Sequence, residues 1–520
     1  MADSCRSWLR TVRDLPKINP DGDGIKYALH SSRKPSAIRF VDITDALAAI
    51  VSPYLLITKL QCDAGLKKLL SEKKPFCGGQ QHSPTSIAAY LVNVEDSLRM
   101  NQKMKTKYII AALVFYLLCY ILPLGAWNLV VPDETRYGEI PREMIAEGDW
   151  VVPHLNGLRY FEKPVLGYWV HAGSILLFGE NNFAVRLPSA MAVGLSALFI
   201  FMLVYRMCRN KTSEDGFPAI LAVLIFLSCF EVVGVDTTAV LDGLFSFFLT
   251  ATITAFYFAS EAPAGSAMEK RFLLLAGVSC GMAFLTKGFL AFAVPVLVLA
   301  PYLVWQRRYF DLFRMSWLPI LTAALVALPW GILIHLREPD FWRFFFWNEH
   351  IRRFMADSAQ HKKSFWFFFM YAPAMFMPWT LLTPAAVVGI RGRIGGRSPQ
   401  DRLIRFSICW LVLPFLFFSV SAGKLLTYIL PCFPPFAILM AFGLTHVLNK
   451  GENKVFQWGV AGAAMLFGLI LLAFVFVQLL GYKGFQPYSQ PWKAMLAVNA
   501  LFFVIIFCFW SFRSQEKIKK

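Results

Sequence analysis

The run DETRYGEIPREM at residues 133–144 directly follows an apolar segment, residues 108–131, that is long enough to cross a bilayer. Charged side chains at a membrane edge are costly to place, so they mark functional sites more often than incidental positions. A second charged segment, RYFEKP at residues 159–164, comes soon after. Together the two segments predict a membrane enzyme that acts on a charged, lipid-borne substrate.

Composition places most of the chain in a bilayer. Of the 520 residues, 57% are hydrophobic and only 16% are charged, a combination that is rare in soluble domains. Each of many apolar runs is long enough to cross about 30 Å of hydrocarbon as a helix. We therefore predict an all-α integral membrane protein with twelve spans, at residues 108–131, 184–205, 217–235, 240–259, 272–286, 288–305, 317–336, 366–390, 404–421, 426–447, 455–479 and 494–512.

Basic side chains indicate how the spans are oriented. The net charge is +18, and the main Lys and Arg clusters fall on alternate connections between the predicted spans. Cytoplasmic loops carry such clusters, so the membrane accounts for this charge and no nucleic-acid partner is predicted. The prediction puts both ends of the membrane part in the cytoplasm and the loops 132–183 and 337–365 on the opposite side.

Residues 1–103 differ from the rest because they are mixed and polar and contain no run long enough to span. They are predicted to be an N-terminal extension of unknown role, or the product of a start site placed too early, since Met104 stands just before the first span. The multi-span core then covers residues 104–447, and residues 448–520 add two further spans.

Carboxylates gather at the outer ends of the predicted spans. Asp133 and Glu134 follow the first span together with Arg136, and Asp236 and Asp242 border the turn between the third and fourth spans. Such groups can orient an acceptor or stabilise positive charge that develops on a sugar carbon. The alternative interpretation for each is capping of a helix end. We predict that the catalytic groups are among these five residues.

Basic residues on the same side suit a phosphate. Lys287 and Lys424 each follow an apolar run, and Lys163 stands in the loop after the first span. These ammonium groups either hold a lipid phosphate as point charges or simply extend to the interface. The loop 337–365, which includes Arg353, is basic although it is predicted to lie outside. Because Arg binds phosphate in a bidentate way, this loop is predicted to bind phosphate.

The same loop holds the best metal ligands by residue type, Glu349 and His350. Neither an HxxxH nor an HExxH spacing accompanies them, so spacing alone does not support zinc.

Several segments taken together resemble one family, the undecaprenyl-phosphate 4-amino-4-deoxy-L-arabinose lipid A transferases. They are DETRY at 133–137, GDWVVPH at 148–154, GLRYFEKP at 157–164, TKGFL at 286–290, EHI at 349–351 and GKLLTYIL at 423–430. The resemblance implies a C-type glycosyltransferase fold with about 12 transmembrane helices and periplasmic loop helices, related to protein O-mannosyltransferases.

The resemblance also implies a reaction. The donor would be 4-amino-4-deoxy-L-arabinose on undecaprenyl phosphate, and the acceptor would be a phosphate of lipid A on the periplasmic face of a Gram-negative inner membrane. No nucleotide cofactor is implied. A cationic sugar on lipid A lowers the negative charge of the cell surface, which would give resistance to polymyxin and cationic antimicrobial peptides.

Individual residues match the family's functional positions. Asp133 matches the catalytic acidic position near the sugar. The other matches are Tyr160 and Lys163 for the donor phosphate, Arg353, Lys424 and Tyr428 in segments that line the donor pocket, and Glu162 with His350 for a zinc site.

Two rival functions and one departure from the family accompany this interpretation. A related enzyme would transfer another sugar or use a protein hydroxyl as acceptor. A lipid-linked sugar transporter would show charges near the middle of several spans and internal repeats, whereas the charges here gather at one face.

Family members continue beyond the twelfth span into a further span and a soluble periplasmic domain, which this chain, ending at Lys520, is predicted to lack.

Overall fold

The computed structural model describes residues 106–208, 216–352, 362–449 and 454–480 of the chain. These residues are mostly helical, with connecting loops and one two-stranded β-hairpin. The prediction of an all-α membrane protein is confirmed. The predicted extension at residues 1–103 lies outside the described residues.

The first helix, Thr106–Ile121, ends in the π-helix η2 (Leu117–Ile121). The strands β1 (His154–Leu155) and β2 (Leu158–Arg159) pair antiparallel. The other helices are α4 (Asp133–Glu147), α5 (Leu166–Phe178), α6 (Asn182–Cys208), α7 (Phe217–Ser228), α8 (Phe230–Asp236), α9 (Leu241–Ser260), α10 (Ala267–Lys287), α11 (Leu290–Trp305), α12 (Asp311–Arg314), α13 (Trp317–Arg337), η3 (Arg343–Arg352), α15 (Phe367–Met375), η4 (Trp379–Leu382), α16 (Thr383–Arg391), α17 (Pro399–Val420), η5 (Leu426–Cys432), α18 (Phe433–Asn449) and α19 (Lys454–Leu480).

Six of the described helices are long and apolar enough to cross a membrane, or eight if each of two bent pairs counts as one span. Shorter apolar helices, among them α11, accompany these spans. Each of the first eleven predicted spans contains a described helix, and the twelfth, 494–512, lies outside the described residues. The connection between the fifth and sixth spans is short, because α10 ends at Lys287 and α11 begins at Leu290.

Three spans differ from the continuous helices that hydropathy predicts. The first ends at Ile121 instead of residue 131, and Pro123, two residues further on, has no N–H to donate to a continuing helix. The third is bent by 63° between α7 and α8, and the eighth by 96° between α15 and η4. Pro378 at the second bend has no N–H to donate to a helical hydrogen bond.

The two bends meet and complete each other's hydrogen bonds. The backbone N–H of Phe230, the first residue of α8, donates to the carbonyl oxygen of Met377 at 2.8 Å. The indole N–H of Trp379 donates to the hydroxyl oxygen of Ser228, also at 2.8 Å. Unpaired backbone groups are expensive inside a bilayer, so broken spans persist where neighbouring segments satisfy them.

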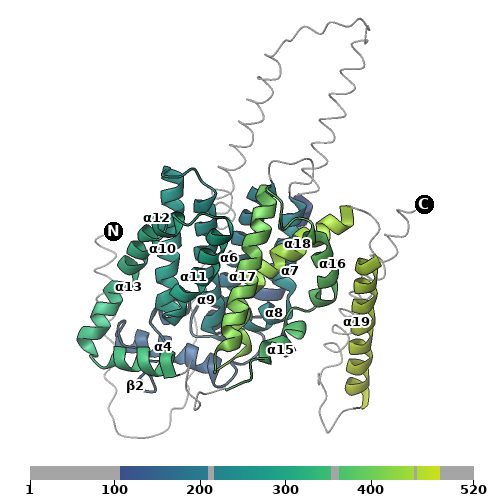
Figure 1. The fold of residues 1–520 in the computed structure, drawn as a ribbon. Coiled ribbons are helices and arrows are strands. Elements are labelled where there is room, and N and C mark those ends of the chain that lie inside the picture. Colours follow the sequence, from purple (N-terminus) through teal and green to yellow (C-terminus); the bar gives the residue numbers. More distant parts are fainter. Residues whose placement is uncertain (1–105, 209–215, 353–361, 450–453, 481–520) are drawn as a thin grey trace, which may run out of the picture. The chain divides into compact units, whose positions relative to one another are not determined.

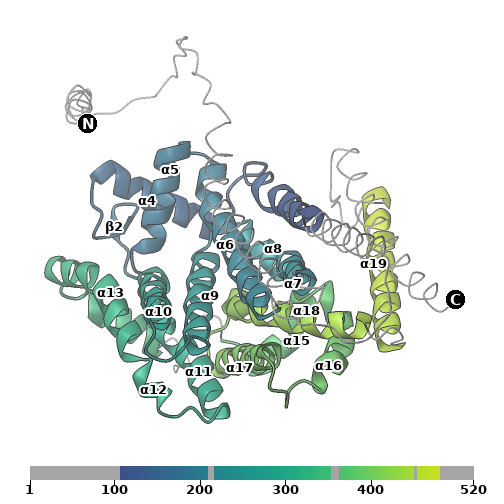
Figure 2. The same ribbon diagram turned by 90° about the horizontal axis from the view of Figure 1, so that it is seen from above.

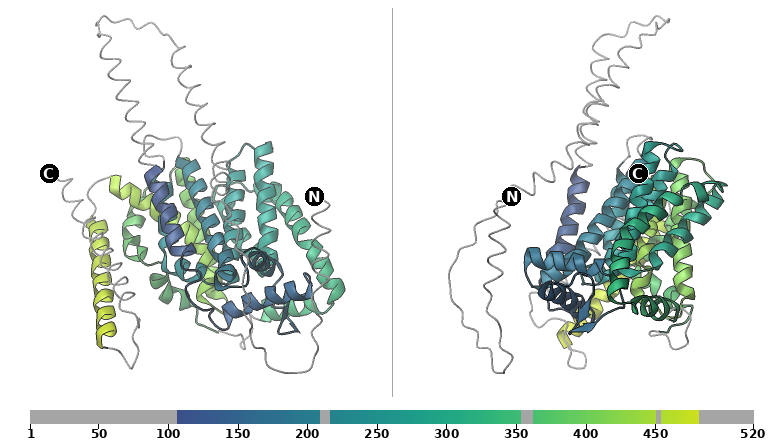
Figure 3. Two further views of the ribbon diagram at one scale, coloured as in Figure 1. Left: turned by 180° about the vertical axis from the view of Figure 1, so that it is seen from behind. Right: turned by 90° about the vertical axis from the view of Figure 1, so that its left-hand side faces the viewer.

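The helix bundle has two distinct ends. α4 and the β1–β2 hairpin lie across one end, and the short α12 lies at the opposite end (Figures 1 and 3). α13 and α19 lie at the periphery (Figure 2), and their apolar windows are only 28% and 17% buried, as expected for lipid-facing helices. α16 and α18 approach closely, since a Cβ added to Gly389 would lie 2.1 Å from the carbonyl oxygen of Gly443. Small residues permit such contacts between membrane helices.

Candidate active site

The first turn of α4 presents its two carboxylates in different directions. Consecutive helical residues are about 100° apart around the axis, so Asp133 faces a cavity while Glu134 faces the core. The side chain of Asp133 is 58% exposed, whereas Glu134 is 1% exposed. Both lie at the positive end of the helix dipole, which stabilises them there. α4 is capped at its C-terminal end by Gly148, whose φ of 71° is the left-handed conformation that glycine adopts readily.

Glu134 forms a fully enclosed ion pair with Arg186 of α6. Nε and Nη2 of Arg186 donate to the two carboxylate oxygens at 2.7 and 2.8 Å, and the backbone N–H groups of Val130 and Ala239 donate to the same oxygens at 2.8 Å. Burial alone would raise the pKa of Glu134, but these hydrogen bonds outweigh it and hold the pKa below its usual value. The carboxylate is therefore charged, structural and unavailable to a substrate.

Arg186 extends this pair into a junction of four chain segments. Its remaining N–H groups donate to the carbonyl oxygens of Leu124, Trp127 and Asn128, and its guanidinium stacks on the indole ring of Trp127 at 4.8 Å. The junction fixes the start of α4, and therefore Asp133, relative to the segment that leads into α9 and Asp242. Sequence reasoning missed Arg186, although a lone Arg in an apolar span is a usable signal.

The β-hairpin is built by an Asn-Gly turn. Asn156 and Gly157 both have positive φ, 53° and 72°, the conformation that two-residue hairpin turns require. The carboxylate of Glu143 accepts hydrogen bonds from the backbone N–H groups of both residues, at 2.6 and 3.1 Å. The hairpin thereby returns the chain toward α4 and places Glu162 and Lys163 at the cavity.

Three contacts fasten this first loop to the end of α13. Arg337 donates to both carboxylate oxygens of Asp149 at 2.7 and 2.9 Å. The indole N–H of Trp330 donates to the carbonyl oxygen of Val151 at 3.0 Å, and Arg159 pairs with Glu338. The loop therefore has a defined position beside the helix that leads into η3.

A cavity of about 750 Å³ lies where these segments meet. One part of its lining is charged and the other is apolar, with Leu290, Phe417 and Phe418 among the apolar residues. The charged residues in the lining are Asp133, Arg136, Glu162, Lys163, Asp242, Lys287 and Glu349. Such a cavity can hold a charged head group while an attached hydrocarbon chain leaves along the apolar side.

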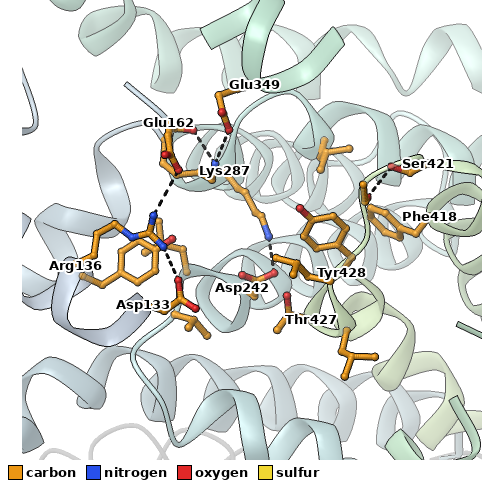
Figure 4. A pocket seen from close by; sticks show the side chains of 18 of the residues that line it. Asp133, Arg136, Glu162, Asp242, Lys287, Glu349, Phe418, Ser421, Thr427 and Tyr428 are labelled. Carbon is orange, nitrogen blue, oxygen red and sulfur yellow. Dashed lines mark hydrogen bonds and ion pairs between the residues drawn. The ribbon is translucent and has the colours of Figure 1, made fainter. Parts of the chain in front are cut away.

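Arg136 organises the side of the cavity next to α4. Its guanidinium lies 2.5 Å from Asp133 Oδ1 and donates to the hydroxyl oxygen of Tyr160 at 3.0 Å. That hydroxyl donates in turn to Glu162 at 2.7 Å, and Figure 4 shows Arg136 between Asp133 and Glu162. Burial, reinforced by Glu162, raises the pKa of Tyr160 well above its usual range, so the hydroxyl remains a donor.

Two lysines face the cavity from different elements. Lys163 Nζ lies 3.1 Å from a carboxylate oxygen of Glu349 in η3. Lys287 Nζ, at the end of α10, lies 2.5 Å from Asp242 Oδ1 and 4.9 Å from the centre of the Tyr428 ring (Figure 4). Each ammonium is thus held over the cavity by a carboxylate, which orients it toward an incoming anion.

The structure brings together most of the residues that the sequence singled out. Three further candidates, Glu134, Asp236 and Lys424, lie away from the cavity. Glu134 is enclosed by Arg186, and Asp236 is 2% exposed and packs on Gly243. Lys424 is also 2% exposed and points to backbone carbonyls. Arg353 and the side chain of His350 lie outside the described part of the chain.

The predicted zinc site stays a prediction. Within the described residues there is no group of three or more His, Cys, Asp or Glu side chains placed to hold a metal ion. Glu162 already accepts a hydrogen bond from Tyr160 and lies 3.7 Å from Arg136. The side chain of His350 lies outside the described residues, and the chemistry below is derived from the side chains that the structure describes.

Comparisons with known proteins agree with this geometry. The family model of dolichyl-phosphate-mannose-protein mannosyltransferases matches residues 105–345. The undecaprenyl phosphate-alpha-4-amino-4-deoxy-L-arabinose arabinosyl transferase of Aeromonas hydrophila is 45% identical over 418 residues, which are 78% of this chain and 72% of that relative. This chain belongs to that arabinosyl transferase family. The protein of the same name from Shewanella sediminis is 42% identical, with 76% of this chain and 71% of the relative covered.

Solved structures agree with the assignment to the arabinosyl transferase family. ArnT from Cupriavidus metallidurans bound to undecaprenyl phosphate is 25% identical with a TM-score of 0.63, and the match covers 80% of this chain and 72% of that one. The same enzyme in the apo state gives a TM-score of 0.66 at 26% identity, with 79% and 72% covered. The chain is therefore a multi-span membrane glycosyltransferase, as the sequence predicted.

Proposed function

We propose that this arabinosyl transferase moves 4-amino-4-deoxy-L-arabinose from undecaprenyl phosphate to a phosphate group of lipid A. The observation that carries the proposal is the cavity itself. Its lining includes Lys163, Lys287 and Arg136 next to four carboxylates, and the rest of the lining is apolar. Three cations suit the phosphates of donor and acceptor, and the carboxylates suit the ammonium of an aminosugar. The names of the relatives, and the undecaprenyl phosphate bound to the Cupriavidus enzyme, support the donor.

The reaction needs little acid–base chemistry. An oxygen of the acceptor phosphate forms a bond to the anomeric carbon while the bond from that carbon to the donor phosphate breaks, and undecaprenyl phosphate leaves with the electron pair. The acceptor phosphate is already ionised near neutral pH, so no strong base is required. The enzyme has to hold two anions together and stabilise the charge that moves between them.

The cavity residues divide this work by charge. Lys163 and Lys287 hold the donor phosphate and stabilise it as it leaves, since their ammonium groups face the cavity from two sides. Asp133, with its exposed carboxylate, faces the sugar and stabilises the positive charge on the anomeric carbon. Arg136 and Tyr160 keep Asp133 and Glu162 oriented. Phe417, Phe418 and Leu290 guide the isoprenyl chain toward the bilayer.

Mass spectrometry of lipid A tests the function. Cells with the gene should carry lipid A with an added aminoarabinose, cells without it should not, and only the former should tolerate polymyxin. Cells that express an Asp133→Asn variant should carry much less of the addition, because that variant transfers the sugar only slowly. If lipid A stays unmodified while another glycan changes, the assigned acceptor is wrong.

We further propose that the cavity opens on the periplasmic side of a Gram-negative inner membrane. The basic connections favour this orientation, since Arg391 at the end of α16 and Arg397 before α17 are both exposed. The connection between these two helices lies at the end of the bundle away from α4 (Figure 1). Single cysteines are placed at Arg159 and at Arg397 in a background without the ten native thiols. With an impermeant reagent, the cysteine at 159 should react only from outside and the cysteine at 397 only from inside. Labelling of both positions from the same side would refute the orientation.

A further inference from the structure

Lys424 lies directly behind the cavity wall. The short segment between α17 and η5 runs from Ser421 to Leu425, and Ser421, Gly423 and Leu425 line the cavity. Side chains of an extended segment alternate between its two faces, so Lys424 points away from the cavity, and it is absent from the lining. A basic residue in this sequence context was expected to meet a phosphate, yet its side chain occupies the opposite face.

The ammonium of Lys424 joins two segments that are far apart in the sequence. Its Nζ donates to the carbonyl oxygen of Lys363 at 3.0 Å and to that of Ser421. The backbones of the same segments also pair. Lys362 and Gly423 form an antiparallel bridge, and the N–H of Lys363 donates to the carbonyl oxygen of Ala422 at 3.2 Å. Residues 362–364 therefore form a strap across the back of the wall.

We propose that Lys424 is a positioning residue that fastens this strap to the cavity wall and thereby sets the position of Tyr428, rather than a ligand of the donor phosphate. Tyr428 comes one turn later in η5 and supports Lys287, whose ammonium lies 4.9 Å from the ring centre. The inference deepens the proposed function and rests on it, since Lys287 is assigned to the donor phosphate there.

The chemistry of the side chain fits a fastener. A buried ammonium is tolerated where its protons meet good acceptors, and the carbonyl oxygens of two different segments provide them. An apolar side chain of similar length would leave those carbonyls without their donor. Burial also lowers the pKa of Lys424, which is the expected cost of enclosing its charge.

Hydrogen exchange of the full-length enzyme in detergent tests the fastener without any substrate. Lys424→Met should speed exchange of peptides that contain Lys363 and residues 421–428 by at least about tenfold, whereas peptides of α9 should be unchanged. Lys362→Met is the matched control, because it removes one exposed positive charge from the same strap. Equal exchange in Lys424→Met and wild type would overturn the proposal. If the methionine variant does not fold, Lys424→Gln replaces it. Its shorter amide cannot reach both carbonyl oxygens, so the same peptides should still exchange faster than in the wild type, and equal exchange would overturn the proposal.

A disulfide separates fastening from phosphate binding. Lys363 and Ala422 are opposite each other in the register of the bridge, at a Cα separation of about 4.5–5.5 Å that a disulfide can span. Lys424→Met should lower kcat for sugar transfer about 10- to 100-fold, as expected for a misplaced wall. In that background, Lys363→Cys with Ala422→Cys should restore transfer on oxidation and lose it again on reduction. A Lys163→Met enzyme with the same cysteine pair should gain nothing.

The two proposals fail in different ways. A wild-type enzyme that transfers no aminoarabinose refutes the proposed function, while the exchange measurement still decides the role of Lys424. The second case is an active wild type together with a Lys424→Met enzyme that oxidation does not rescue. If that variant also mainly raises the donor KM, as Lys163→Met does, Lys424 is a phosphate ligand and its proposed positioning role is wrong.

Discussion

Replacement of Arg186 by methionine should destabilise the enzyme by about 3–5 kcal/mol, because it leaves the carboxylate of Glu134 buried without its counter-charge. Both side chains of the pair are at most 2% exposed, so water cannot replace the lost partner. The variant should also lose transfer activity, since the junction holds Asp133 and the segment before Asp242 together. Unfolding in detergent, followed by heat or denaturant, measures the effect.

Two controls make the Arg186 prediction specific. Arg206 lies at the other end of the same helix, is exposed, and stacks on Phe258 and Phe272, so Arg206→Met should cost no more than about 1 kcal/mol. The double variant Arg186→Met with Glu134→Gln should recover part of the loss, because no charge remains buried. An Arg186→Met enzyme as stable as Arg206→Met would contradict the role of the pair.

The same pair predicts a dependence of stability on pH. The pKa of Glu134 is lower in the folded enzyme than in the unfolded chain. The carboxylate therefore contributes fully to folding stability above the ordinary carboxylate pKa of about 4.3. That contribution should disappear as the pH falls through the lowered folded value. In the double variant this part of the acid sensitivity should be absent.

Replacement of Asp133 by asparagine should lower kcat by about 10²- to 10³-fold, the usual effect of losing one preorganised group aimed at developing charge. Asparagine keeps the size of the side chain but removes the negative charge that faces the anomeric carbon. Because a phosphate acceptor needs no base, measurable transfer should persist. A protein-hydroxyl acceptor would require Asp133 as a base, and then the asparagine variant should be inactive.

A neighbouring carboxylate gives the matched control for Asp133. Glu139 lies on the same helix, pairs with Arg142 at 2.5 Å and is not among the residues that line the cavity. Glu139→Gln should therefore transfer sugar at the rate of the wild type. Steady-state rates with a synthetic undecaprenyl-linked donor, together with the donor KM, separate chemistry from binding. An Asp133→Asn enzyme with unchanged kcat would remove Asp133 from the proposed mechanism.

Sequence patterns were informative about the site wherever charge met hydrophobicity. Asp133 and Lys287 were singled out because they follow apolar runs, Asp242 because it borders the turn between two spans, and Lys163 because it lies in the second charged segment. All four line one cavity. The same reasoning could not tell Asp133 from its neighbour Glu134, because both occupy the same kind of local sequence. Only the packing of α4 against α6 separates an exposed carboxylate from an enclosed one.

Hydropathy by itself determined the class of the protein, most of its spans and the end of the bundle where charge gathers. These properties follow from composition over about 20 residues and from the fixed thickness of a bilayer, so they are local. The tertiary structure alone decided that Arg186 meets Glu134 across 52 residues, that Lys424 turns away from the cavity, and that two spans bend where they contact each other. The physical reason is that each of these outcomes depends on which distant segment supplies a counter-charge or a hydrogen bond.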